Sequence, residues 1–164
     1  AGIDNTSRSP ILRSTSIFHY CLDKELLAKD TLYAWCMDPK FKSFRITLYP
    51  NLNPEKHDTG YTITSEILSG PEESKEFNSE MVLKELISLG IVAKDSKVLS
   101  HAEQVLHNTF PVPEIGFMEN INQVSEKIKN EMSNLILFGR STGKTWFMTD
   151  VFRDIFQVIG NLNK

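Results

Sequence analysis

The feature that most constrains this chain is a two-residue alternation of apolar and polar side chains in its first half. In residues 44–49 the apolar set is Phe44, Ile46 and Leu48, and Arg45 belongs to the opposite set with Thr47 and Tyr49. Residues 61–68 repeat the pattern. Successive side chains of a β-strand point to opposite faces of a sheet, so each segment predicts a strand that buries one face.

Three further segments have strand character. Residues 14–22 are rich in β-branched and aromatic side chains, and residues 98–109 predict a strand broken around Glu103. Residues 31–37 are apolar on both sides, which predicts a strand covered on two faces. Proline-containing turns keep the connections short, so we predict an antiparallel sheet of about five or six strands.

The period then changes to that of helices. We predict helices over 74–89 and 119–130 and a last helix over 150–159, with Thr149 as its N-cap. In the last helix, the residues expected to be buried are Val151, Phe152, Ile155, Phe156 and Ile159. Between the last two helices, residues 135–138 are wholly apolar, which is typical of a buried parallel strand. The chain is therefore predicted to be an α+β protein.

Composition excludes several function classes. The 164 residues carry a net charge of −3 without a basic excess, which argues against a nucleic-acid partner. No apolar run approaches the length of a membrane span. Cys21 and Cys36 fit neither redox nor zinc spacing and predict two buried thiols in a reducing, cytoplasmic compartment. The four histidines show no metal-ligand spacing, so no metal site is expected.

One motif suggests a nucleotide-phosphate loop. Gly139 to Thr145 reads Gly-Arg-Ser-Thr-Gly-Lys-Thr and lies between an apolar segment and a helix. A phosphate loop has four residues between its glycines, whose N–H groups wrap a phosphate. Here only three residues separate Gly139 and Gly143, so the cradle lacks one amide. P-loop-like nucleotide binding is the least favoured of the alternatives.

A second interpretation accounts for the same turn at residues 139–145. The tail runs from Phe-Pro-Val-Pro at 110–113 through a helix to Asn-Leu-Ile-Leu-Phe-Gly-Arg at 134–140, then an aromatic turn and a helix. Upstream are the strand with Arg45 after an aromatic residue and the Thr-Ile-Thr-Ser-Glu segment at 62–66. In order and spacing, residues 12–160 resemble the C-terminal part of flavin-dependent amine oxidase-like proteins, in particular the UDP-galactopyranose mutase group.

The resemblance implies roles for individual residues. Arg45 would bind substrate, at the diphosphate of a nucleotide-sugar. The cofactor-contacting residues would be Gly139, Arg140, Trp146, Met148 and Thr149. Met148 stands where the mutases carry an acidic residue, which implies a different substrate or none. No catalytic residue is implied.

The resemblance also implies an organisation and a function. Residues 1–10 would be a loose leader, 11–113 a substrate-type sheet domain, and 114–164 the returning end of a Rossmann-like FAD-binding half. The chain would be the C-terminal, substrate-binding fragment of a flavin-dependent oxidoreductase or of a mutase, which is an isomerase. Its partner would be an N-terminal FAD-binding half.

Two expectations concern the fragment by itself. It contains no Gly-x-Gly pair, so we expect it to bind no FAD and to be inactive without the other half. The unpaired apolar strand 135–138 would leave an edge through which the chain forms a homodimer. A non-catalytic binding module that keeps the same fold is the main alternative.

Overall fold

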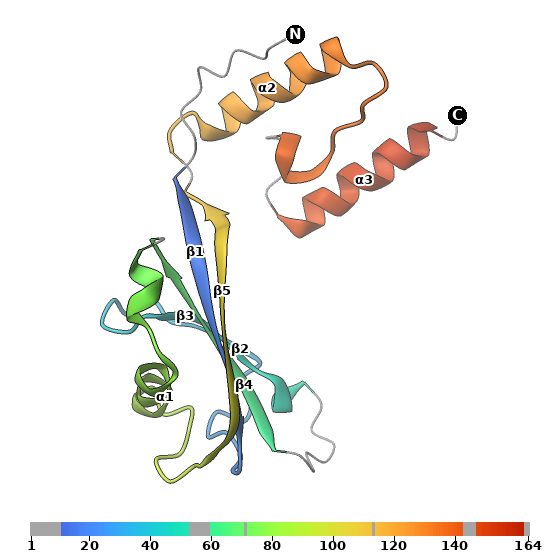
Figure 1. Ribbon diagram of the computed structural model, residues 1–164. Coiled ribbons are helices and arrows are strands. Elements are labelled where there is room, and N and C mark those ends of the chain that lie inside the picture. Colours follow the sequence, from blue (N-terminus) through green and yellow to red (C-terminus); the bar gives the residue numbers. More distant parts are fainter. Residues whose placement is uncertain (1–10, 53–59, 71, 113, 143–146, 163–164) are drawn as a thin grey trace. The chain divides into compact units, whose positions relative to one another are not determined.

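The computed structural model describes residues 11–52, 60–70, 72–112, 114–142 and 147–162 (Figure 1). These residues form two compact units. One is Leu12–Pro111 and the other contains the segments on either side of it. Each unit is described by itself.

The unit Leu12–Pro111 is built on one antiparallel sheet. Its strands are β1 (Leu12–Leu22), β2 (Tyr33–Trp35), β3 (Ser43–Leu48), β4 (Tyr61–Ser69) and β5 (Val98–Pro111). They lie in the order β2-β3-β4-β1-β5, and every pair is antiparallel. The predicted antiparallel sheet and α+β class are confirmed. The Rossmann-like completion of the fold stays a prediction.

One face of this sheet carries the core. Helix α1 (Ser79–Ser88) places Val82 and Leu86 against it, and both are almost fully buried. The sheet contributes the apolar members of the alternating pattern: Phe18, Tyr20, Leu22, Ile46, Leu48, Ile63 and Ile67. Burial of each such side chain stabilises the fold by roughly 1.5–3 kcal/mol relative to leaving it in water.

Local signals set the ends of α1. The Asn78 side chain accepts a hydrogen bond from the backbone N–H of Met81 at 3.0 Å, which satisfies a donor that the first turn leaves open. Gly90, at φ +71°, follows the helix in the left-handed conformation that stops helices. A short 3₁₀ turn, Glu73–Glu76, precedes α1, so the predicted helix over 74–89 is two elements rather than one.

Two strand predictions need correction. β5 runs unbroken past Glu103, and its register against β1 shifts only near its ends, once around Asn108, which has φ +57°. β2 is an edge strand whose Tyr33 and Trp35 side chains are more than half exposed, so it is not covered on two faces. Bulges and strand order depend on pairing partners that a single segment does not reveal.

The second unit contains α2 (Phe117–Glu131), a 3₁₀ turn at Gly139–Thr142 and α3 (Met148–Leu162). Residues 135–138 are not a strand, contrary to prediction, and no strand in the described part of the chain pairs with them. An apolar run becomes a parallel strand only where neighbouring strands accept its backbone hydrogen bonds. Phe152, Phe156 and Ile159 of α3 are also exposed, so the prediction that they are buried is wrong.

Cys21 and Cys36 are thiols and are half-buried rather than fully buried. Among the described residues, no helix has the length and apolar character needed to cross a membrane.

Candidate functional site

The face of the sheet opposite α1 carries the polar members of the alternating pattern. We call it the polar face and define it by two rows of paired residues. One row pairs Trp35 with Arg45, Arg45 with Glu66, and Glu66 with Ile17. The neighbouring row pairs Thr47 with Thr64 and Thr64 with His19.

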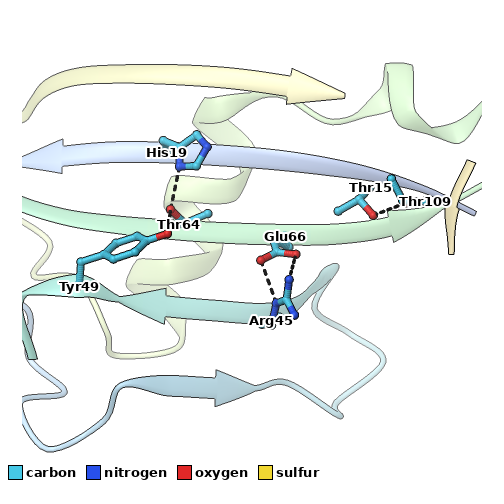
Figure 2. Close-up of polar contacts among 7 residues, drawn as sticks. All are labelled: Thr15, His19, Arg45, Tyr49, Thr64, Glu66 and Thr109. Carbon is cyan, nitrogen blue, oxygen red and sulfur yellow. Dashed lines mark hydrogen bonds and ion pairs between the residues drawn. The ribbon is translucent and has the colours of Figure 1, made fainter. Parts of the chain in front are cut away.

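Arg45 and Glu66 form a two-point ion pair on this face (Figure 2). Arg45 Nε donates to Glu66 Oε1 at 2.8 Å, and Nη2 donates to Oε2 at 2.5 Å. The Glu66 carboxylate raises the pKa of the Arg45 guanidinium, chiefly through this hydrogen bonding. The carboxylate uses two of the five guanidinium N–H groups, so three remain on the Nη1 and Nη2 end of the fork.

Two aromatic rings flank the same guanidinium. Its central carbon lies 5.9 Å from the Trp35 ring centroid and 5.7 Å from that of Phe44. Phe44 reaches this position because it is the extra residue of a bulge between Ser43 and Arg45. The predicted placement of Phe44 on the buried face is therefore wrong: Ser43 takes that position and is buried. Arg45 is thus held by one carboxylate and two rings, with its free end on the polar face.

The neighbouring row contains a chain of polar contacts. The Thr64 hydroxyl donates to Tyr49 Oη at 3.5 Å and lies 2.7 Å from His19 Nδ1 (Figure 2). A threonine hydroxyl has one proton, so when it donates to Tyr49 it accepts from His19 Nδ1–H. In that arrangement a neutral imidazole carries its proton on Nδ1, and its Nε2 is an acceptor.

A cavity of about 440 Å³ lies over this second row. Among the described residues, it is lined by no acidic, lysine or arginine side chain; the lining residues are His19, Tyr20, Cys21, Tyr49, Thr62, Ile63, Thr64, Ser100, His101 and Ala102. His19 and Thr64 are each two residues along their strand from the row of Arg45, which is a separation of about 7 Å. The polar face therefore offers a fixed cation beside a hollow lined with hydroxyl groups and the His19 imidazole.

The cofactor-contacting residues predicted in the tail are placed only in part. Gly139 lies at φ +78° at the start of the 3₁₀ turn, where a left-handed conformation favours glycine. Its N–H donates to Asp154 Oδ2 at 3.1 Å. The side chain of Arg140 and all of Trp146 lie outside the described residues.

Met148 and Thr149 lie in the first turn of α3, and both are exposed. Thr149 is not the N-cap, contrary to prediction. The helix begins at Met148, two residues before the predicted start, and the Phe147 carbonyl accepts the first hydrogen bonds, from the N–H groups of Asp150 and Val151.

The Gly139 amide is not free to bind a phosphate. A dinucleotide needs backbone amides that point at its phosphates, and the Gly139 amide instead donates to a carboxylate, which would repel a phosphate. A phosphate loop fits no better, because the strand that should precede Gly139 is absent and residues 143–145 lie outside the described part. Within that part, no group of three or more acidic, histidine or cysteine side chains could hold a metal ion.

Comparison with solved structures gives the fold a context. The chain matches the crystal structure of a reduced UDP-galactopyranose mutase with a TM-score of 0.58 and 14% identity, over 76% of this chain and 27% of that one. It matches a protoporphyrinogen oxidase from Exiguobacterium sp. 255-15 with a TM-score of 0.54 and 10% identity, over 81% and 31%. This chain shares part of their fold. The resemblance inferred from sequence is confirmed at that level.

The chain spans less than a third of either enzyme. No protein-family model matches the sequence, and no curated protein does.

Sequence reasoning named Arg45 but missed the residues around it. Glu66, the partner of Arg45, is the last residue of the Thr-Ile-Thr-Ser-Glu segment. The position of Glu66 on the polar face follows from the alternation of that segment. His19, Tyr49 and Thr64 were not singled out, because their proximity depends on the register of β1 against β4. The available signal was parity: His19 and Thr64 both lie on the polar side of their predicted strands.

Proposed function

We infer that this chain is the substrate-binding part of a flavin-dependent enzyme of the mutase or oxidase type. The order of motifs in the sequence and the structural similarity to a mutase and an oxidase support this inference. In the complete protein the FAD would be held by a portion outside this chain. The flavin would supply the redox or covalent chemistry, and this chain would supply binding and orientation.

The observation that carries the proposal is the state of Arg45. A surface arginine usually samples many rotamers, whereas this one is fixed by a two-point contact with Glu66, whose side chain is only 12% exposed. The fork end that remains free matches the spacing of two phosphate oxygens. Arg45 is therefore suited to bind an anionic substrate such as the diphosphate of a nucleotide-sugar.

The neighbouring cavity extends this surface. His19 Nε2 can accept a hydrogen bond from a substrate hydroxyl, and the Tyr49 hydroxyl can donate one. A substrate whose phosphate binds Arg45 would thus place its uncharged portion over the cavity row. The mutase reaction itself and the identity of the substrate are part of the proposal.

The proposal is tested by titrating UDP into the protein made from its full native reading frame, with binding measured by calorimetry. We expect Arg45→Met to weaken UDP binding by about 10- to 100-fold, the equivalent of a lost hydrogen-bonded charge contact. Arg13→Met is the matched control, because Arg13 is another half-exposed sheet arginine whose carboxylate partner, Glu73, lies 3.8 Å away. Equal UDP binding by the wild type and Arg45→Met would refute the role of Arg45.

The alternative of a non-catalytic module predicts a different result in the same preparation. Such a protein would bind UDP through Arg45 yet carry no flavin after purification or after incubation with FAD. That outcome would support Arg45 as a binding residue and would contradict the flavin-dependent enzyme.

A further inference from the structure

The edge strand β5 is an open backbone surface. It is the last strand of the sheet, and within the described part of the chain no strand pairs with its outer side. Every residue from Val98 to Phe110 is exposed. Natural edge strands are usually short or are protected by lysine or proline along their length. β5 is long, has no lysine and carries proline only at its end, at Pro111.

The middle of β5 is regular enough to act as a pairing template. Residues Ser100 to Leu106 pair with β1 in unbroken register, and both register shifts fall outside this stretch. A regular edge strand presents alternate N–H and C=O groups to one side at the spacing that another strand requires.

The sequence of this stretch is complementary to itself. In an antiparallel pair of two copies with a two-fold axis at Ala102, His101 lies opposite Glu103 and Ser100 lies opposite Gln104. Val98 and Leu99 then lie toward Val105 and Leu106 of the other copy. Each histidine thus lies opposite a carboxylate, polar residues lie opposite polar ones, and apolar residues lie opposite apolar ones. Ala102, on the axis, is the smallest residue of the segment.

Other registers lack this match. An axis at Glu103 places two carboxylates opposite each other, and an axis at His101 places two imidazoles opposite each other. The Glu103 carboxylate is available for the favoured register because, among the described residues, only its Oε1 is engaged, accepting from the Ser79 N–H at 2.9 Å. Opposite residues lie on the same face of the sheet, so His101 and Glu103 of the two copies would meet on the α1 side.

We propose that β5 is a self-association edge, through which two copies of this chain join their sheets about a two-fold axis at Ala102. The interface is isologous, as closed dimers require. It joins the two sheets into one continuous sheet and removes the exposed edge. This surface differs from residues 135–138, which the sequence had suggested as the dimerising edge.

Oxidative cross-linking tests the register directly. In a Cys21→Ser/Cys36→Ser background, Ala102→Cys would face its own copy at about 4.5–5.5 Å between Cα atoms, within disulfide range. Gln104→Cys is the matched control, because two residues at that position would lie about 13 Å apart along the strands. We expect a disulfide dimer from Ala102→Cys and essentially none from Gln104→Cys. Equal cross-linking of both, or none from Ala102→Cys, would overturn the proposal.

A charge swap tests the same register without cysteines. Sedimentation of the 164-residue chain should give twice its 18.7 kDa monomer mass. His101→Glu puts two carboxylates opposite each other and should weaken dimerisation by about tenfold, and His101→Glu/Glu103→His should restore it. Leu27→Glu, at an exposed loop position, adds the same charge elsewhere and should leave the dimer unchanged. A monomeric wild-type chain, or a double variant no better than His101→Glu, would contradict the proposal.

Discussion

Glu66 holds Arg45 by both carboxylate oxygens, at 2.8 Å to Nε and 2.5 Å to Nη2. The two residues are directly opposite on β4 and β3, so the register of the sheet sets their geometry. This contact leaves one end of the guanidinium available on the polar face. The orientation of the proposed anion-binding group is thus a property of the strand pairing.

Replacing Glu66 should disturb binding more than folding. We expect Glu66→Gln to weaken UDP binding by about threefold to tenfold, because one fixed contact to Nε or Nη2 is lost and the guanidinium gains rotamer freedom. The free energy of unfolding should fall by less than about 1 kcal/mol, as for partly exposed ion pairs. Calorimetry and urea unfolding measure the two effects. Glu73→Gln is the control for removing a carboxylate that pairs with a different arginine.

Tyr20 should make stability depend on alkaline pH. Burial, with a smaller contribution from Glu103 and Glu85, raises the pKa of the Tyr20 phenol well above its ordinary value of 10.0. Above that value the unfolded chain loses the proton while the folded chain keeps it, so the free energy of unfolding falls as pH rises. Below that value the full contribution of the neutral phenol is present.

Urea unfolding at neutral pH and at about pH 11 tests this dependence. Tyr20→Phe should lose about 1 kcal/mol at neutral pH, because its hydroxyl donates to the Ser79 carbonyl at 2.8 Å. It should then lose less on going to high pH than the wild type does. Tyr33→Phe, at an exposed position, is the control and should retain the wild-type slope. An unchanged slope in Tyr20→Phe would show that another group carries the effect.

Truncation of the core beneath α1 should be costly. Leu86 is fully buried against the sheet, so Leu86→Ala removes packed methyl groups and leaves a cavity. We expect a loss of about 2–5 kcal/mol in the free energy of unfolding, measured by urea denaturation. Met81→Ala on the same helix, 48% exposed, should cost less than about 1 kcal/mol. Similar losses from both would mean that α1 does not pack on the sheet as described.

The contribution of the N-terminal cap of α1 to stability should be separable from that of the packing of α1 on the sheet. Asn78→Ala removes the acceptor for the Met81 N–H and should cost about 1 kcal/mol, whereas Asn78→Asp keeps an oxygen at that position. Thermal unfolding of the two variants measures the difference. Equal melting temperatures would show that the cap contributes nothing.

The alternating pattern predicted the sheet because its cause is local. Ile46, Leu48, Ile63 and Ile67 are buried on the side that the period-2 pattern assigns to them, and Arg45 lies on the other. The bulge at Phe44 escaped prediction because it exists only relative to β4. The contact between His19 and Thr64 depends on register in the same way.

The tail was harder to predict because its apolar residues lack an unambiguous partner. Residues 135–138 have the composition of a buried strand but pair with no strand in the described part of the chain. α3 has a strong apolar face, yet Phe156 on that face is 74% exposed. Composition predicts that such residues seek burial, and only the surrounding structure decides whether they find it.

The most direct test of the proposed function is the visible absorbance spectrum of the protein from its full native reading frame, recorded before and after UDP is added. We expect flavin bands that shift when UDP binds, and we expect Arg45→Met to abolish this shift and Arg13→Met to retain it. A colourless protein after incubation with FAD, or a UDP-induced shift unaffected by Arg45→Met, would contradict it.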